Sequence, residues 1–484
     1  MQLNNPDLLR SQCLINGVWC DAQSGHRESV INPATGVEIT SVPMVNGIET
    51  ERAISAAQQA QQSWKQLTAK ARSALLLAWA DAILEAQKDL AQLMTAEQGK
   101  SLAEARGEVA YAASFITWFA EEAKRIDGSI LQAPVATQRL VVIKQPIGVC
   151  AAITPWNFPA AMITRKVAPA LAAGCSIIVK PAEQTPLTAL ALAKLAEDAG
   201  IPAGVLQVIT GAGKQVGKVL CDSPVVRKLS FTGSTEVGRI LMAQCAPSIK
   251  KLSLELGGNA PFIVFDDANL DAAVAGIMAS KFRNSGQTCV CANRIYVQDG
   301  IHDALVEKLK LAVEQLVVGD GSQYGTTQGP LIDQQAVAKV QSHIADALEK
   351  GAQLLTGGHQ HPLGLTFFEP TVVTGVTQEM CFAREETFGP VAPVFCFQTE
   401  EQVIAMANDT EFGLAAYLFT SSAARQWRVP EALEYGMVGV NTGLISNEVG
   451  PFGGIKQSGL GREGSRYGID EYLELKYMCI DIAE

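Results

Sequence analysis

The sequence predicts an α/β protein with a Rossmann-type, doubly wound parallel sheet. Between residues 149 and 235, short runs rich in β-branched residues alternate with segments of helical periodicity, and such alternation is typical of a parallel sheet covered by helices. A second α/β pattern runs from residue 260 to about 435. Before both, residues 49–126 carry apolar side chains at three- and four-residue spacing, which predicts a helical segment. We therefore expect two α/β units behind a helical opening.

The elements can be followed along the chain. Residues 14–48 are expected to form short strands and turns, and helices are expected at 53–64, 71–87, 89–99 and 102–125. The first α/β unit is expected to contain strands at 149–153, 176–180, 205–209 and 228–231, with helices at 160–173, 185–199 and from 214. The second is expected to contain strands at 262–265, 294–297, 371–373 and 391–397, with helices at 270–282, 302–316 and 335–350. Two further strands are predicted at 140–143 and 471–480.

Size, charge and cysteine usage exclude several classes of protein. A chain of 484 residues has room for about three domains at ~150 residues each. The formal net charge of −11, without a Lys/Arg cluster, argues against a nucleic-acid partner. The 11 cysteines are scattered without C-x-x-C spacing, so no metal site is expected. With neither a signal peptide nor an uninterrupted apolar run of about 18 residues, we expect a cytoplasmic location and no membrane contact.

The segment GQTCVC at 286–291 presents a cysteine in a small, turn-prone stretch. A thiol reacts as the thiolate, which needs a polarised and partly open setting. Flexible backbone at Gly286 and donors at Gln287 and Thr288 can supply that setting, so we interpret Cys289 as a nucleophile. The alternative is a buried structural cysteine.

Three other stretches support the interpretation of Cys289 as a nucleophile. LSLELGG at 252–258 alternates apolar and polar residues before a Gly-Gly turn, which places Glu255 at a strand end where a carboxylate can act as a base. TPWNFP at 154–159 is a rigid turn before a predicted helix, and the amide of Asn157 can stabilise an oxyanion there or simply cap the helix. EETFGP at 385–390 is an acidic pair entering a turn, which alone would be taken for a solvated loop.

Together these stretches resemble the aldehyde dehydrogenase superfamily. The resemblance runs over essentially the whole chain, from NPATG at 32–36 to PFGGIKQSG at 451–459, with the motifs in the family's order. It implies that Cys289 attacks an aldehyde and that Asn157 holds the oxyanion. It further implies that hydride leaves to a nicotinamide cofactor and that Glu255 activates the water that hydrolyses the thioester.

The resemblance also implies a domain arrangement and an assembly. We expect a cofactor-binding domain at 1–127 and 147–256, a catalytic domain at 257–445, and a small β extension for oligomerisation at 128–146 and 465–484. A homodimer or homotetramer is the expected assembly. A catalytically silent family member with a structural role is the non-enzyme alternative.

Cofactor residues are expected at the carboxyl ends of the strands of the first unit, where dinucleotides bind such sheets. Glu183 can accept hydrogen bonds from both ribose hydroxyls and repels a 2′-phosphate, so NAD is expected to be preferred, with NADP possible. Its alternative role is an acidic residue at a helix start. By resemblance, the other cofactor residues are Trp156, Asn157, Lys180, Gly233, Ser234, Leu256, Glu386 and Phe388. The GLGREG segment at 459–464 fits G-x-G-x-x-G but is followed by too few residues for a βαβ unit, so we reject it.

Within the superfamily, MITRK at 162–166, KFRNSGQTCVC at 281–291 and LISN at 444–447 resemble the succinate-semialdehyde dehydrogenases. Arg165, Arg283 and Ser446 could meet the carboxylate of a short semialdehyde, although each arginine could instead form a structural salt bridge. Glutarate semialdehyde is one methylene longer, a difference worth only about 1–3 kcal/mol in a pocket, so it and other short-chain aldehydes stay open.

Cys291 lies two residues after the predicted nucleophile. It is either a small core residue or a redox partner that forms an inhibitory disulfide with Cys289, and the sequence leaves both open.

Overall fold

A computed structural model of the 484-residue chain describes residues 1–483. Its larger sheet has eight strands in the order β19-β11-β10-β7-β8-β9-β1-β2. Their bounds are β1 (Cys13–Ile15), β2 (Val18–Cys20), β7 (Val149–Ile153), β8 (Ser176–Lys180), β9 (Leu206–Val208), β10 (Val226–Thr232), β11 (Lys251–Glu255) and β19 (Gly459–Leu460). The five central strands, β7 to β11, run parallel, and β1, β2 and β19 pair antiparallel. The predicted doubly wound sheet is therefore confirmed.

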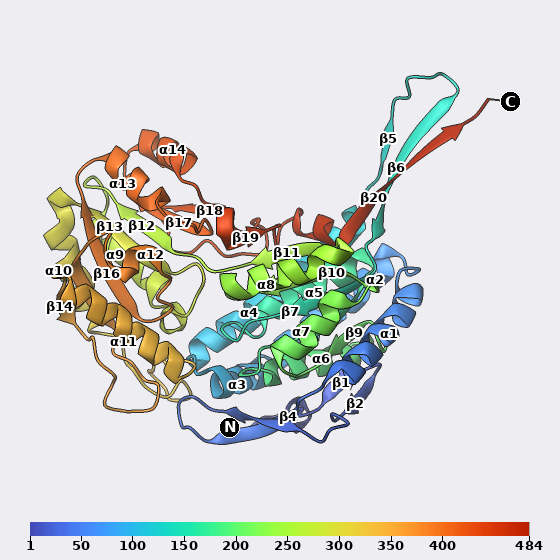
Figure 1. Ribbon diagram of the computed structural model, residues 1–484, viewed down its shortest axis with the longest axis horizontal. Coiled ribbons are helices and arrows are strands. Elements are labelled where there is room, and N and C mark those ends of the chain that lie inside the picture. Colours follow the sequence, from blue (N-terminus) through green and yellow to red (C-terminus); the bar gives the residue numbers. More distant parts are fainter. Residues whose placement is uncertain (484) are drawn as a thin grey trace.

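The helices of the first half surround this sheet (Figure 1). They are α1 (Gly47–Trp64), α2 (Ala69–Glu85), α3 (Gln87–Gln98), α4 (Leu102–Glu122), α5 (Ala161–Ala173), α6 (Leu187–Asp198), α7 (Gly213–Asp222) and α8 (Thr235–Cys245). Helix α5 is buried along its whole length, because α4 covers it on the side away from the sheet. Strand order reverses between β7 and β10, so the crevice between their carboxyl ends is where a dinucleotide would be held.

The second sheet has the order β14-β15-β16-β13-β12-β17-β18, and only β14 runs antiparallel to its neighbour. Its strands are β12 (Ala260–Val264), β13 (Ala292–Gln298), β14 (Gln353–Thr356), β15 (Thr371–Val376), β16 (Val391–Phe397), β17 (Ala415–Phe419) and β18 (Met437–Val440). Its helices are α9 (Leu270–Lys281), α10 (His302–Val313), α11 (Gln334–Glu349), α12 (Cys381–Arg384), α13 (Glu400–Asn408) and α14 (Ala423–Ala432). The sequence interpretation did not include β14, β17, β18, α13 and α14.

Two smaller sheets complete the fold. Strands β3 (Arg27–Ile31) and β4 (Glu38–Pro43) pair as a hairpin. Strands β5 (Ser129–Leu131), β6 (Gln138–Pro146) and β20 (Leu473–Asp481) form a three-stranded sheet in the order β20-β6-β5. This sheet projects from the body beside the C-terminus (Figure 1). Both predicted isolated strands lie in it, whereas the predicted domain limits stay a proposal.

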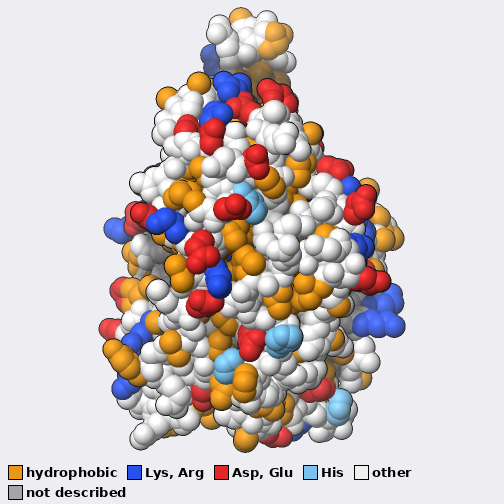
Figure 2. Space-filling view, turned by 90° about the vertical axis from the view of Figure 1, so that its left-hand side faces the viewer, with side chains coloured by type: hydrophobic (Ala, Val, Ile, Leu, Met, Phe, Trp, Pro, Cys, Tyr) orange, Lys and Arg blue, Asp and Glu red, His pale blue; other side chains and the backbone are white. Residues whose placement is uncertain are grey.

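The surface mixes both signs of charge. On the face of the molecule shown in Figure 2, Lys and Arg side chains lie among Asp and Glu side chains without forming a continuous basic area. Within residues 1–483, none of the helices combines the length and the apolar character needed to cross a bilayer.

Candidate active site

The loop that carries Cys289 is held in an unusual backbone conformation. Asn284, Ser285 and Gly286 have φ values of 51°, 56° and 73°, in the left-handed region that favours glycine. A Cβ atom on Gly286 would lie 2.1 Å from the carbonyl oxygen of Gly389, so no larger residue fits. The loop therefore packs directly against the backbone of the 385–390 turn.

Cys289 stands where two cavities meet. It lines a cavity of about 420 Å³ at the carboxyl ends of β7 and β10, and it also lines a smaller cavity on the side of α4 and α5. Burial, and secondarily the carboxylate of Glu386, raises the pKa of its thiol to about 12, while Arg165 opposes this rise. The thiol is therefore protonated at neutral pH, and its attack on a carbonyl requires a proton acceptor.

The Asn157 turn is tied to the Cys289 loop from both sides. The side-chain Nδ2 atom of Asn157 donates to the backbone carbonyl of Gln287 at 3.0 Å. The backbone carbonyl of Asn157 accepts from Asn284 Nδ2 at 3.0 Å. An amide nitrogen has two N–H groups, so the second remains for an oxyanion near Cys289.

A buried ion pair anchors this turn. Lys100 Nζ donates to the Asn157 carbonyl at 2.7 Å and pairs with Glu108. The other carboxylate oxygen of Glu108 accepts the N–H groups of Ala160 and Ala161 at 2.9 and 3.2 Å. The Lys100–Glu108 pair thus caps the start of α5 and also holds the Asn157 turn in place.

Glu255 ends β11 and is 3% exposed. Neither of its carboxylate oxygens has a hydrogen-bond partner among the described residues. Burial, and secondarily the nearby carboxylate of Glu463, raises the pKa of Glu255 well above its usual value. A carboxyl group with a raised pKa is suited to exchanging a proton near neutral pH.

The larger cavity gathers most of the predicted cofactor residues. Its lining includes Trp156, Asn157, Gly233, Ser234, Leu256, Glu386 and Phe388. Phe388, with a φ of 56°, packs edge-on against Trp156 at a centroid distance of 5.5 Å. Ser234 also caps α8 by accepting from Val237 N.

Lys180 and Glu183 lie beside the start of α7. Their side chains form an ion pair with a distance of 2.7 Å between Lys180 Nζ and Glu183 Oε1. The same oxygen accepts the Gly213 N–H at 2.7 Å. This carboxylate is therefore fixed at the carboxyl end of β8, next to the switch point of the sheet.

Glu386 reaches the cavity from the opposite unit. Its Oε1 atom accepts the Gly258 N–H at 3.3 Å, and burial raises its pKa to about 7. A Cβ atom on Gly258 would lie 2.7 Å from the carbonyl oxygen of Cys289, so the Gly-Gly turn approaches the Cys289 backbone closely. These features fit a nicotinamide dinucleotide, because a carboxylate, a helix N-terminus and closely approaching backbone surround one cavity.

The smaller cavity brings the predicted substrate residues together. Its lining consists of Tyr111, Phe158, Met162, Arg165, Arg283, Thr288, Cys289, Val290, Ser446 and Phe452. Two guanidinium groups and the hydroxyls of Tyr111, Thr288 and Ser446 thus share one small space with the thiol.

Arg165 forms a salt bridge, which is the alternative role that the sequence left open. Its Nη2 atom lies 2.9 Å from Glu463 Oε2, and its guanidinium stacks on the Phe452 ring at 3.8 Å. However, Nε and Nη2 make no hydrogen bond with good geometry to the described residues. The group is therefore held in place with donors to spare.

Sequence reasoning missed several residues of this site. Glu463, which also pairs with Lys166, lies in the rejected glycine segment, and Tyr111 was taken as part of an ordinary helical run. The nearest signal for Glu463 was an acidic residue in a glycine-rich turn, which does not reveal its partner.

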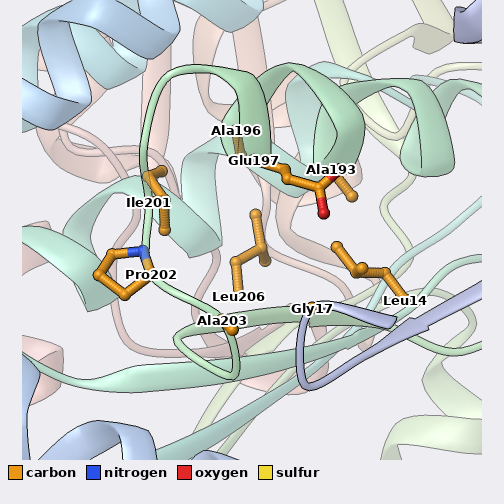
Figure 3. A pocket seen from close by; sticks show the side chains of 9 residues that line it. All are labelled: Leu14, Gly17, Ala193, Ala196, Glu197, Ile201, Pro202, Ala203 and Leu206. Carbon is orange, nitrogen blue, oxygen red and sulfur yellow. The ribbon is translucent and has the colours of Figure 1, made fainter. Parts of the chain in front are cut away.

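Another cavity, of about 160 Å³, contains none of the predicted site residues. Figure 3 shows its lining between the β1–β2 turn and α6, with Leu14, Gly17, Glu197 and Leu206 among the labelled residues. The carboxylate of Glu197 already accepts from Trp19 Nε1 at 3.2 Å, so this cavity has no free set of catalytic groups.

Residues 19–478 match the pattern of the aldehyde dehydrogenase family, and the chain belongs to that family.

Several proteins with named activities are similar to this chain over nearly its whole length. The chain is 62% identical to a glutarate-semialdehyde dehydrogenase of Pseudomonas aeruginosa, over 99% of both chains. It is 63% identical to an Escherichia coli K12 protein named as an NADP(+) succinate-semialdehyde dehydrogenase, over 100% of both chains. A crystal structure of succinate-semialdehyde dehydrogenase from Burkholderia pseudomallei has a TM-score of 0.99 and 62% identity, covering 99% of this chain and 100% of that chain.

Proposed function

We propose that the protein oxidises a short semialdehyde with a terminal carboxylate, foremost succinate semialdehyde to succinate, with NAD or NADP as the hydride acceptor. The observation that carries the proposal is the cavity that Arg165, Arg283 and Ser446 share with Cys289. The cationic groups of this cavity favour a carboxylate.

The chain's own groups account for each step of this reaction. The Cys289 thiol gives its proton to a water molecule, its sulfur bonds to the aldehyde carbon as the C=O π bond breaks, and Asn157 with the backbone N–H of Cys289 stabilises the resulting oxyanion. When bound, the cofactor accepts the hydride that leaves the carbon, and a thioester on Cys289 remains. Glu255 then takes a proton from water, the water oxygen bonds to the thioester carbon, and the C–S bond breaks to release the acid.

The substrate is tested by measuring kcat/KM for succinate semialdehyde, glutarate semialdehyde and uncharged butanal. We expect the two charged substrates to exceed butanal by roughly 30-fold or more, because an ion pair with a guanidinium is worth at least about 2 kcal/mol. Equal values for all three would contradict a carboxylate site. The semialdehyde with the higher kcat/KM is the preferred substrate. The absence of any NADH formation would favour the catalytically silent alternative.

For the cofactor, we propose that NAD is preferred over NADP. The carboxylate of Glu183 lies at the edge of the sheet where the adenosine ribose is expected, and it would repel a 2′-phosphate. Because Lys180 pairs with that carboxylate, the preference should be moderate. The E. coli relative is named for NADP(+), so the comparison by itself does not support NAD.

The cofactor preference is tested with Glu183→Ser. We expect kcat/KM for NADP to rise by about tenfold and kcat/KM for NAD to fall. A parent enzyme that already prefers NADP would overturn this part of the proposal.

We also propose a homodimer or homotetramer assembled through the projecting sheet. Ile130 on β5 is 81% exposed and Leu475 on β20 is 70% exposed, and such apolar surface on an edge sheet favours contact with another subunit. Light scattering of Ile130→Lys with Leu475→Lys should show a smaller mass than the parent protein.

A further inference from the structure

Tyr111 has a hydroxyl without a partner in the small cavity. It lies on α4, and its ring packs edge-on against Phe115 with a centroid distance of 4.9 Å. The Oη atom is buried and makes no hydrogen bond to any of the residues described. A buried polar group normally has a partner, so this hydroxyl points to a ligand.

The surroundings of Tyr111 indicate the charge of that ligand. The side chain lines the cavity together with Arg165, Arg283 and Ser446. Burial raises the pKa of Tyr111, and the two guanidinium groups oppose the rise, so the phenol keeps its proton and can only donate to an anion. Two arginines and the hydroxyl groups of Tyr111, Thr288 and Ser446 thus line one small cavity.

We infer that Tyr111 is a specificity-determining residue whose hydroxyl donates to the terminal carboxylate of the substrate. The inference rests on the proposed function and extends it, because it assigns an anion contact to α4, which the sequence predicted only as a helix. A carboxylate has about four acceptor positions, so Tyr111 can bind without displacing either arginine.

The test compares Tyr111→Phe with the parent enzyme on succinate semialdehyde and on butanal. We expect kcat/KM for the semialdehyde to fall about tenfold through KM, since hydrogen bonds to charged groups lie at the strong end of their range. For butanal we expect no change. Butyrate, used as a competitive inhibitor of butanal oxidation, should show the same tenfold loss in affinity, which measures the anion contact without the chemical step.

The melting temperature distinguishes a binding role of Tyr111 from a purely structural role. Because the hydroxyl makes no hydrogen bond within the protein, Tyr111→Phe should melt at the parent temperature or above it. Trp118→Phe is the matched control: it lies on the same helix, its Nε1 atom also lacks a partner among residues 1–483, and it lines a different cavity. This control should leave both substrates unchanged.

The outcomes separate this inference from the proposed function. A parent enzyme with no preference for the charged aldehyde over butanal would overturn the proposed function, and this inference with it. A parent enzyme with that preference, fully retained in Tyr111→Phe, would overturn only the role of Tyr111. Equal losses on both substrates together with a lower melting temperature would assign Tyr111 to packing and would also overturn the inference.

Discussion

The two cavities that meet at Cys289 differ in how their polar groups are satisfied. On the cofactor side, Glu183 is paired with Lys180, Ser234 caps a helix, and Glu386 accepts a backbone N–H. On the substrate side, Nε of Arg165 and the Tyr111 hydroxyl make no hydrogen bond to the described residues, although Nη2 of Arg165 forms an ion pair with Glu463.

This difference has a physical consequence. Groups that already have partners lose some of them, or share them, when a ligand binds, so their net contribution to affinity is small. Unpaired buried donors cost free energy in the free protein, of order 1–3 kcal/mol each, and regain it when the right ligand arrives. Selectivity should therefore be sharp on the substrate side and gradual on the cofactor side.

The largest effect is expected at Glu255. Glu255→Gln keeps the size of the side chain but cannot accept a proton from water. We expect one hydride transfer per site as a rapid NADH burst, followed by turnover at least about 10³-fold slower than the parent, because base catalysis contributes about 10²–10⁴-fold. Stopped-flow absorbance measures both phases. Cys289→Ala is the control and should show no burst, and parent-like turnover of Glu255→Gln would assign the base elsewhere.

The next largest effect is expected when either arginine of the smaller cavity is removed. Arg283→Ala and Arg165→Ala should each raise KM for succinate semialdehyde by about 10–100-fold, with little change for butanal, because only the charged substrate loses an ion pair.

The two arginine variants should differ in stability. Arg165 packs on Phe452 and faces Glu463 in a buried setting, so its removal should lower the melting temperature, with an upper limit of about 3–5 kcal/mol for a broken buried pair. Arg283 is partly exposed and lies 4.9 Å from the Phe158 ring, so its removal should change stability little. Equal destabilisation in both would indicate general damage to the fold.

A smaller, pH-dependent effect is expected on the cofactor side. Because burial raises the pKa of Glu386 to about 7, its carboxylate is lost as the pH falls through 7, and with it the charge that we propose contacts the cofactor. We expect the Kd for NADH to rise severalfold from pH 8 to pH 6, and to be nearly flat in Glu386→Gln; fluorescence titration measures both.

Titration of Glu386 also affects the free energy of unfolding: a rise in pH favours NADH binding but lowers the stability of the fold. Between its ordinary value of 4.5 and about 7, the folded protein holds a proton on Glu386 that the unfolded chain has released. The free energy of unfolding therefore falls as the pH rises through this window. Glu386→Gln should remove that slope, and an unchanged slope would show that Glu386 does not titrate there.

The sequence predicted the alternation of the first sheet because its strands are continuous apolar runs bounded by clear turn residues. It missed β17 and α14 for different reasons: a five-residue apolar run fits either a strand or a helix, and α14 carries few apolar residues and Pro430 in its interior. Local patterns therefore identified only elements with strong periodicity.

The site was predictable where one short motif carries the chemistry, and unpredictable where partners come from distant segments. Lys166 and Glu463 are separated by 297 residues and still pair in the core. Likewise, Lys100 holds the carbonyl of Asn157 across 57 residues. Such contacts depend on the complete fold, so no local pattern in one sequence reveals them.

The smallest effect concerns Cys291, which tests whether the Cys289 loop can leave its observed conformation. Cys291 is fully buried, its thiol faces the Lys281 carbonyl at 3.6 Å, and its N–H donates to the Thr288 carbonyl at 2.9 Å. A bond to Cys289 therefore requires the thiol to leave Lys281, and the resulting strain would make the disulfide easy to reduce.

We predict that mild peroxide inactivates the enzyme and that dithiothreitol restores most activity in the parent, with less recovery in Cys291→Ala. In this reaction peroxide is reduced to water while the two thiols lose two electrons and two protons to form the S–S bond. Without Cys291, oxidation of Cys289 continues to sulfinic acid, which dithiothreitol does not reverse. Peptide mass spectrometry should find the Cys289–Cys291 linkage in the inactivated parent, and equal recovery in both proteins without that linkage would leave Cys291 as a core residue.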